Sequence, residues 1–140
     1  NLLRRKVYEQ VSKVLGEPVN AIHRSAAVSP SVVMTCGHFI SANVSINALT
    51  RLGKTAVCNT GSVIEHGCVI GDHAFIAPGA VLNGDVTIGD NTFVGANSVI
   101  KQGVVVGKNV IIGAGTVIIR DVPDGVTIVG NPGRIIKTQV

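Results

Sequence analysis

An apolar residue recurs at every sixth position along most of the chain, starting at Ile22 and continuing without interruption to Ile118. The residues of this series are Ile22, Val28, Met34, Ile40, Ile46, Leu52, Cys58, Ile64, Ile70, Ile76, Leu82, Ile88, Val94, Ile100, Val106, Ile112 and Ile118. A helix repeats its apolar face every 3.6 residues and a strand every two, so neither element alone produces this period. A chain that turns a corner every six residues does produce it, because each apolar residue then points to one shared axis.

The residue four positions after each member of this series is usually small, as at Ala56, Ser62, Ala74, Ala80 and Ser98. Such side chains fit the narrow interior of a triangular prism. Three six-residue sides make one coil, so equivalent residues of successive coils stack about 4.8 Å apart along the axis. The repeats from 28 to 118 predict roughly five such coils, which bury a continuous core through their neighbours although only 3% of the residues are aromatic. We therefore predict a mainly β fold, a parallel β-helix.

The segments on either side of the repeats break the period. Near the N-terminus, apolar residues at helical spacing and Gly16 as a stop signal predict a short amphipathic helix. We divide the chain into residues 1–21, a helix with a linker, and residues 22–140, a β-helix domain with a C-terminal cap. The cap is expected to contain a strand over 126–129 and to close the open end of the solenoid with the segment 130–134.

Composition narrows the classes of function. The chain is 46% apolar but has no uninterrupted apolar stretch of transmembrane length, so membrane insertion is not expected. Its formal charge is +4 at pH 7, yet the basic residues are scattered, which disfavours nucleic-acid binding and suits an anionic small molecule. Cys58 and Cys68 fall on inward positions and Cys36 on an outer one, which indicates neither disulfides nor a metal site. We expect a cytoplasmic protein, since that compartment is reducing.

The residue after each apolar repeat position begins a corner, and the three corners differ in character. The first corner carries Gly53, Gly71, Gly89 and Gly107, the second carries Ala77, Gly95 and Gly113, and the third carries Asn47, Glu65, Asn83 and Lys101. Two corners are nearly bare and the third is polar. Any chemistry is therefore expected at the third corner.

His66 is the strongest candidate for catalysis at that polar corner. The unperturbed pKa of histidine, near 6.5, suits a general base at neutral pH, and His66 takes an outward position in the middle coils. A histidine on the surface of a solenoid can also be merely solvated. Against that interpretation, Gly84 lies one coil above His66 and leaves a notch where a backbone N–H could receive a carbonyl oxygen next to the base.

The bare second corner suggests a different use. Its triplets 77–79, 95–97 and 113–115 stack into a strip with few side chains, along which a long thin ligand such as the pantetheine arm of coenzyme A could lie. The same small residues could also serve only to turn the chain. The strip and the polar corner face different directions on one subunit. Three prisms side by side would bring them together, so we expect a homotrimer.

Three stretches of the chain resemble the hexapeptide-repeat sugar acetyltransferases, a family that includes sialic-acid O-acetyltransferases and nucleotide-4-amino-sugar N-acetyltransferases. These stretches are 59–72, 81–89 and Gly130-Asn131-Pro132, and the repeat unit at 70–75 reads Ile-Gly-Asp-His-Ala-Phe. The resemblance covers nearly the whole chain. It implies a left-handed β-helix and an acetyl-CoA-dependent transfer of an acetyl group to a hydroxyl or amino group of a sugar.

The resemblance also implies roles for single residues. His66 would be the base that deprotonates the acceptor, and Gly84 would bind the thioester carbonyl through its N–H. Ala96 and Ala114 would line the coenzyme A groove through backbone atoms. Phe75 also falls at a coenzyme A-binding position, one where several N-acetyltransferase members carry a second histidine.

The family pattern differs from this chain next to the base as well. Several N-acetyltransferase members carry an acidic residue directly after the catalytic histidine, where this chain has Gly67. Together with Phe75, this departure favours O-acetylation slightly. Glu65 is the adjacent acid and is counted with the catalytic residues, although strand alternation would point its side chain away from His66.

Other functions stay open at this point. The family usually has an N-terminal α/β domain that holds the sugar nucleotide, and residues 1–21 look like its last helix, so the chain is expected to be part of something longer. A non-catalytic trimerising β-helix is the alternative from a different class. A metal protein of the γ-carbonic-anhydrase kind is a weaker one, because His23, His38 and His73 lack the necessary spacing. We expect no metal, and a hydrogen-bonded structural role for His38.

Overall fold

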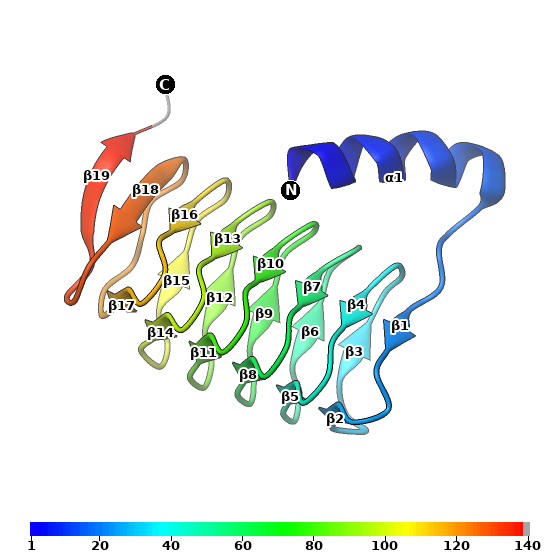
Figure 1. Ribbon diagram of the computed structural model, residues 1–140, viewed down its shortest axis with the longest axis horizontal. Coiled ribbons are helices and arrows are strands. Elements are labelled where there is room, and N and C mark those ends of the chain that lie inside the picture. The colour runs from blue at the N-terminus through cyan, green and yellow to red at the C-terminus, as the bar shows by residue number, and fades with distance from the viewer. Residues whose placement is uncertain (139–140) are drawn as a thin grey trace.

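The computed structural model describes residues 1–138, which form one helix followed by a solenoid of short strands (Figure 1). The helix α1 (Leu2–Leu15) ends at Gly16, as predicted. Strands β1 to β17 follow one another around three faces, and each pairs in parallel with a strand of a neighbouring coil. At three strands per coil they make nearly six coils. The fold agrees with the predicted left-handed parallel β-helix.

Each face of the prism is one sheet. Sheet A consists of β1 (Ala21–Ile22), β4 (Phe39–Ile40), β7 (Val57–Cys58), β10 (Phe75–Ile76), β13 (Phe93–Val94), β16 (Ile111–Ile112), β18 (Val126–Val129) and β19 (Arg134–Thr138). Sheet B consists of β2 (Ala27–Val28), β5 (Ser45–Ile46), β8 (Val63–Ile64), β11 (Val81–Leu82), β14 (Val99–Ile100) and β17 (Val117–Ile118). Sheet C consists of β3 (Val33–Met34), β6 (Arg51–Leu52), β9 (Val69–Ile70), β12 (Thr87–Ile88) and β15 (Val105–Val106).

The register of the strands confirms the coil length. Phe75 pairs with Phe93 and Ile76 with Val94, so paired residues are 18 apart in sequence. The second residue of each strand is the apolar repeat position and points inward. These residues and the small residues that follow them form the core from β4 onward, and their burial supplies the main stabilising term.

Helix α1 contacts the solenoid through its polar face. The side-chain amide of Asn1 donates a hydrogen bond to the Asn91 carbonyl at 2.9 Å, and the Arg4 guanidinium donates to the His73 carbonyl at 2.6 Å. The apolar side chains of the helix, such as Leu3, point away and are exposed. The helix is therefore amphipathic as predicted, but its apolar face does not pack on the β-helix.

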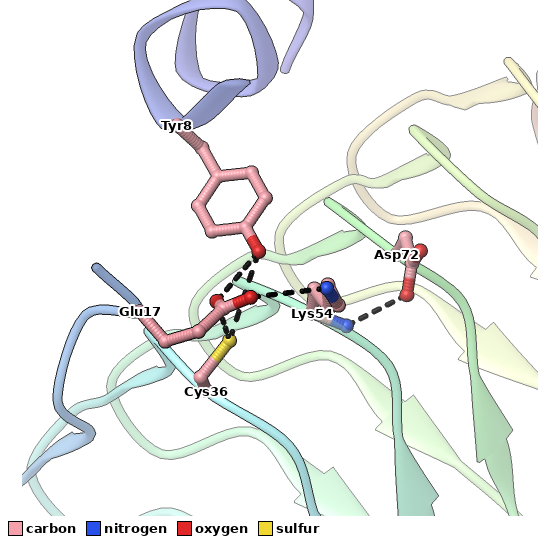
Figure 2. A network of polar contacts seen from close by, with 5 residues as sticks. All are labelled: Tyr8, Glu17, Cys36, Lys54 and Asp72. Carbon is pink, nitrogen blue, oxygen red and sulfur yellow. Dashed lines mark hydrogen bonds and ion pairs between the residues drawn. The ribbon is translucent and has the colours of Figure 1, made fainter. Parts of the chain in front are cut away.

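The carboxylate of Glu17 links helix α1 to the first coils through hydrogen bonds and an ion pair. Figure 2 shows Tyr8 pointing from α1 toward Glu17, whose Oε2 accepts hydrogen bonds from the Tyr8 hydroxyl at 2.6 Å and the Cys36 thiol at 2.7 Å. Glu17 Oε1 pairs with Lys54 Nζ at 3.2 Å. The hydrogen bonds from Cys36, Tyr8 and Lys54 lower the pKa of Glu17 to about 2. The carboxylate therefore stays ionised and holds three elements together.

The C-terminal segment closes the far end of the solenoid. Strand β18 extends sheet A in parallel with β16, as expected for residues 126–129, and β19 then pairs antiparallel with β18. In the turn between them, Gly133 lies against the side chains of Ile118 and Ile128, which end the core. Strand β19 itself was not predicted from the sequence. No helix among residues 1–138 has the length and apolar character needed to cross a bilayer.

Candidate active site

The three corners run the length of the prism and are named here by the sheets that they join. Corner AB consists of 77–79, 95–97 and 113–115; corner BC of 47–49, 65–67, 83–85 and 101–103; and corner CA of 53–55, 71–73, 89–91 and 107–109. These are the three groups that the sequence separated. Except at Pro78, the middle residue of each turn has a backbone N–H that is not used by the sheets, so its partner decides what the corner can do.

Corner CA is closed by a ladder of carboxylates. The N–H of Lys54 donates to Asp72 Oδ1 at 2.7 Å, and the N–H of Asp72 donates to Asp90 Oδ1 at 3.0 Å. Further along, the N–H of Lys108 donates to Asp124 Oδ1 at 2.7 Å. Each carboxylate comes from the next coil, so three of the four turns use their middle backbone donors to hold the coils together, whereas no hydrogen bond among residues 1–138 uses the N–H of Asp90.

Corner BC carries the predicted base. The His66 side chain is 58% exposed, and its Nδ1 lies 3.6 Å from Glu65 Oε2. The expectation that Glu65 points away is wrong, because the glutamate side chain is long enough to bend back along the corner from its strand-end position. Glu65 thus lies beside the imidazole, with its carboxylate on the Nδ1 side.

The imidazole of His66 occupies the space that a side chain at residue 84 would need. A Cβ atom placed on Gly84 would lie 2.6 Å from Cε1 and 2.7 Å from Nε2 of His66. Among residues 1–138, no hydrogen bond uses the N–H of Gly84. Gly84 therefore lies against the imidazole from the coil above, as the sequence spacing predicts, and it has a backbone N–H that the described residues leave unused.

Corner AB has free donors but almost no side chains. Its middle residues include Ala96 and Ala114, and no hydrogen bond of the described segment uses either N–H. Ala114 is exposed and Ala96 is half-buried. An extended ligand along this corner could accept hydrogen bonds from both residues without meeting a long side chain. The sequence carries a signal for this difference, because Gly71 and Gly89 of corner CA are followed by aspartates, whereas Gly95 and Gly113 of corner AB are followed by alanines.

Phe75 lies on a face of the prism, sheet A, and not at a corner. It belongs to β10 in sheet A, where its ring stacks on Phe93 with centroids 5.3 Å apart and lies 5.8 Å from the Arg4 guanidinium. Its side chain thus packs within the chain, between a neighbouring strand and helix α1. The structure does not bring Phe75 together with His66 in one subunit.

Two of the other histidines, His38 and His73, are buried. His38 is 1% exposed, as its inward position predicts, but neither ring nitrogen has a hydrogen-bond partner among residues 1–138. Burial lowers the pKa of His38. His73 is buried as well, and its Nδ1 lies 2.6 Å from the Thr55 hydroxyl.

Neither metal ligands nor reactive thiols are gathered in the described part of the chain. Within residues 1–138, no three His, Cys, Asp or Glu side chains converge in a way that could hold a metal ion. The three cysteines are free. Burial raises the pKa of Cys58 to about 12 and that of Cys68 to about 11, so both thiols stay protonated.

Comparison with known proteins identifies the family. Residues 85–120 match the family model described as the hexapeptide repeat of succinyl-transferase. The structure of a GDP-perosamine N-acetyl transferase variant from Caulobacter crescentus, in complex with CoA and GDP-perosamine, is 39% identical, with a TM-score of 0.96 over 98% of this chain and 65% of that chain. The chain belongs to the hexapeptide-repeat sugar acetyltransferases. The family resemblance read from the sequence is confirmed.

Two further solved structures are similar to this chain over almost its whole length. The acetyltransferase domain of PglB from Neisseria gonorrhoeae, in complex with acetyl coenzyme A, is 33% identical, with a TM-score of 0.92 over 96% of this chain and 65% of that chain. WeeI from Acinetobacter baumannii is 31% identical, with a TM-score of 0.92 over 96% of this chain and 66% of that chain. The chain spans slightly less than two thirds of these proteins.

Proposed function

We propose that this chain transfers the acetyl group of acetyl-CoA to the amino group of a nucleotide-linked sugar, with His66 as the general base. The observation that carries the proposal is the packing of the His66 imidazole against Gly84, whose N–H is free. A proton acceptor and an oxyanion donor thus lie side by side on an exposed corner. Acyl transfer needs that combination.

The chemistry follows from these two groups. The acceptor nitrogen attacks the thioester carbonyl while His66 takes its proton, so a C–N bond forms and the carbonyl oxygen becomes an oxyanion. The N–H of Gly84 donates a hydrogen bond to that oxyanion. Collapse of the tetrahedral intermediate breaks the C–S bond and releases the thiol of coenzyme A, which takes up a proton. Glu65 beside Nδ1 stabilises the imidazolium formed in the first step.

Corner AB supplies the coenzyme A groove in this proposal. The free N–H groups of Ala96 and Ala114 donate to the amide carbonyls of the pantetheine arm. On one chain, corners AB and BC lie at opposite edges of sheet B, separated by six residues of extended chain, or at most about 20 Å. We therefore assign the complete site to a homotrimer, in which corner BC of one subunit faces corner AB of its neighbour.

The relatives favour an amine over a hydroxyl as the acceptor. The Caulobacter crescentus protein is a perosamine N-acetyl transferase, and its structure contains GDP-perosamine with CoA. This comparison outweighs the slight preference for O-acetylation drawn from Gly67 and Phe75. The proposed co-substrate is acetyl-CoA, and the proposed acceptor is a sugar nucleotide with a free amino group.

A further domain before the helix fits the same proposal. The related proteins are longer than this chain by about a third of their length. The exposed apolar residues of α1, among them Leu3, Val7 and Val14, offer a surface on which such a domain can pack. We assign the binding of the nucleotide to that domain and place the protein in the cytoplasm, where its free cysteines remain reduced.

The decisive experiment incubates the protein with acetyl-CoA and a panel of acceptors that contains amino-sugar nucleotides, their hydroxyl analogues and sialic acids. We expect acetylation of an amino-sugar nucleotide and no transfer by the His66→Ala variant. Titration calorimetry with acetyl-CoA tests the alternative directly, because a non-catalytic trimerisation module has no reason to bind it. Absence of both binding and transfer would favour that module.

The shared site is tested separately by light scattering. A trimer should have about three times the 14.4 kDa mass of the chain. A monomer that retains full activity would refute the assignment of the two corners to different subunits.

A further inference from the structure

We propose that Asp85 is a positioning residue that supports His66 and supplies the negative charge that several family members carry on the residue after the histidine. This inference rests on the proposed role of His66 as the base. It answers a question that the sequence raised, since Gly67 occupies the position of that acidic residue. The carboxylate in this chain comes from the coil above.

At corner BC, two neighbouring coils exchange side-chain contacts. A side chain of each coil occupies the space beside a glycine of the other coil. The His66 imidazole packs against Gly84 of the next coil. In return, the Asp85 carboxylate reaches down to Gly67, where Oδ1 occupies the place of a Cβ atom. The N–H of Asp85 also donates to the His66 carbonyl at 2.8 Å. Asp85 is thus attached to the turn of the base through both its backbone and its side chain.

The charge of Asp85 is not required by this packing. At corner AB the same arrangement recurs, because the side chain of Asn97 lies over Gly79 as that of Asp85 lies over Gly67. Both residues have left-handed backbone, with φ of 55° and 61°. A neutral amide is therefore sufficient for the structural task. The carboxylate at residue 85 adds only a negative charge, and it adds it at Gly67, the residue after His66.

That charge acts on the protonated form of the base. When His66 takes the proton of the acceptor, an imidazolium forms on an exposed corner, and a nearby carboxylate favours it. Glu65 is the acid within 4 Å of the imidazole among the described residues, so Asp85 acts through space at a longer distance. Lys101, one coil above Asp85, opposes this effect, and the following turn of corner BC carries the opposite charges of Arg120 and Asp121.

The first test is Asp85→Asn, which keeps the packing seen at Asn97 and removes the charge. On the amino-sugar nucleotide, we expect kcat to fall about threefold and the pH at which kcat/KM reaches half its plateau to fall by about half a unit. KM for acetyl-CoA should stay the same, since Asp85 is not at corner AB. Asp72→Asn at corner CA removes a charge far from the base and should leave the pH profile unchanged.

The second test moves the carboxylate. Asp85→Gly suits the left-handed backbone and opens the space beside residue 67, and Gly67→Asp then places the acid directly after the histidine. The double variant should recover most of the activity that Asp85→Gly loses, together with the wild-type pH profile. A purely structural role would predict no rescue.

The outcomes separate the two proposals. Wild-type kinetics and pH profile in Asp85→Asn would overturn the positioning role of Asp85 while leaving His66 as the base. Full activity in His66→Ala would instead overturn the proposed function. A loss in Asp85→Asn, together with rescue of Asp85→Gly by Gly67→Asp, supports the inference.

Discussion

Corners CA and BC are built from the same six-residue repeat, yet they treat their backbone donors in opposite ways. At corner CA, aspartates of the next coil accept hydrogen bonds from three of the four middle N–H groups, as Asp72 does from Lys54. At corner BC the N–H of Gly84 is left free, and the His66 imidazole lies beside it. The solenoid is stable with either arrangement. A corner becomes available for chemistry where the chain leaves a donor unused next to a suitable side chain.

Corner AB differs from both. It also leaves donors free, but its turns 77–79, 95–97 and 113–115 carry no side chain that could take part in proton transfer, and they therefore suit binding rather than catalysis. One repeat thus provides a closed corner, a binding corner and a reactive corner. Variants at each corner should change different quantities.

The largest effect is expected from His66→Ala, which removes the reactive group of corner BC. Loss of a general base typically lowers the rate by about 10²–10⁴-fold, and the loss should appear in kcat, because acetyl-CoA is held elsewhere. Steady-state kinetics and calorimetry with acetyl-CoA measure the two quantities. Near-wild-type turnover with rate-limiting chemistry would show that the comparison of corners assigns the wrong residue.

Gly84→Ala should have the next largest effect. The added methyl group would lie 2.6 Å from Cε1 of His66, so the imidazole must move, and a displacement of about 1 Å can cost on the order of 10²-fold in rate. The free energy of unfolding should change by no more than about 0.5 kcal/mol, since Gly84 does not have left-handed backbone. In a His66→Ala background the same substitution should cost little more, which a double-mutant cycle tests.

Ala114→Trp tests the binding corner. The indole fills the path of the pantetheine arm but remains outside the core, because Ala114 is exposed. We expect the Kd for acetyl-CoA to rise about tenfold, or about 1.4 kcal/mol, at an unchanged melting temperature. Wild-type affinity in a folded trimer would place coenzyme A away from corner AB.

His38 is buried, in contrast to the exposed His66, and its protonation lowers the stability of the fold at low pH. Kinetic comparisons between the corners therefore need a pH at which the fold is stable. Burial lowers the pKa of His38 below 6.5, so the unfolded chain binds the proton more readily than the folded chain. The contribution of His38 to the free energy of unfolding is therefore fully present above about pH 6.5. At lower pH the free energy of unfolding falls by at most about 1.4 kcal/mol per pH unit for this group. Urea unfolding at several pH values should show this slope reduced in His38→Leu. His73, whose pKa is lowered mainly by burial, contributes in the same direction.

The smallest effect is expected at the closed corner. Asp72→Ala leaves the N–H of Lys54 without its carboxylate, which should lower the free energy of unfolding by about 0.5–1 kcal/mol. Turnover and acetyl-CoA affinity should match those of the wild type. A loss of activity at unchanged stability would mean that corner CA belongs to the site, contrary to the comparison.

Much of the fold could be predicted from the sequence because it is a local repeat. An inward residue at every sixth position requires only that each coil stack on the next, so the strands, their register and the division into three corners follow without long-range information. Helix α1 and strand β18 also follow from local signals. Strand β19 and the outward-facing apolar side of α1 do not, because they depend on which surface each segment meets.

Within the site, the sequence determined the residue types and their spacing along the corners. It placed His66 one coil below Gly84, and a period of 18 residues was sufficient for that. Only the tertiary structure decided where the side chains point: Glu65 bends back beside the imidazole, and Asp85 reaches down to Gly67. The physical reason is that the repeat dictates the backbone of each coil, whereas a side chain at a corner takes the space that the glycines of the neighbouring coil leave open.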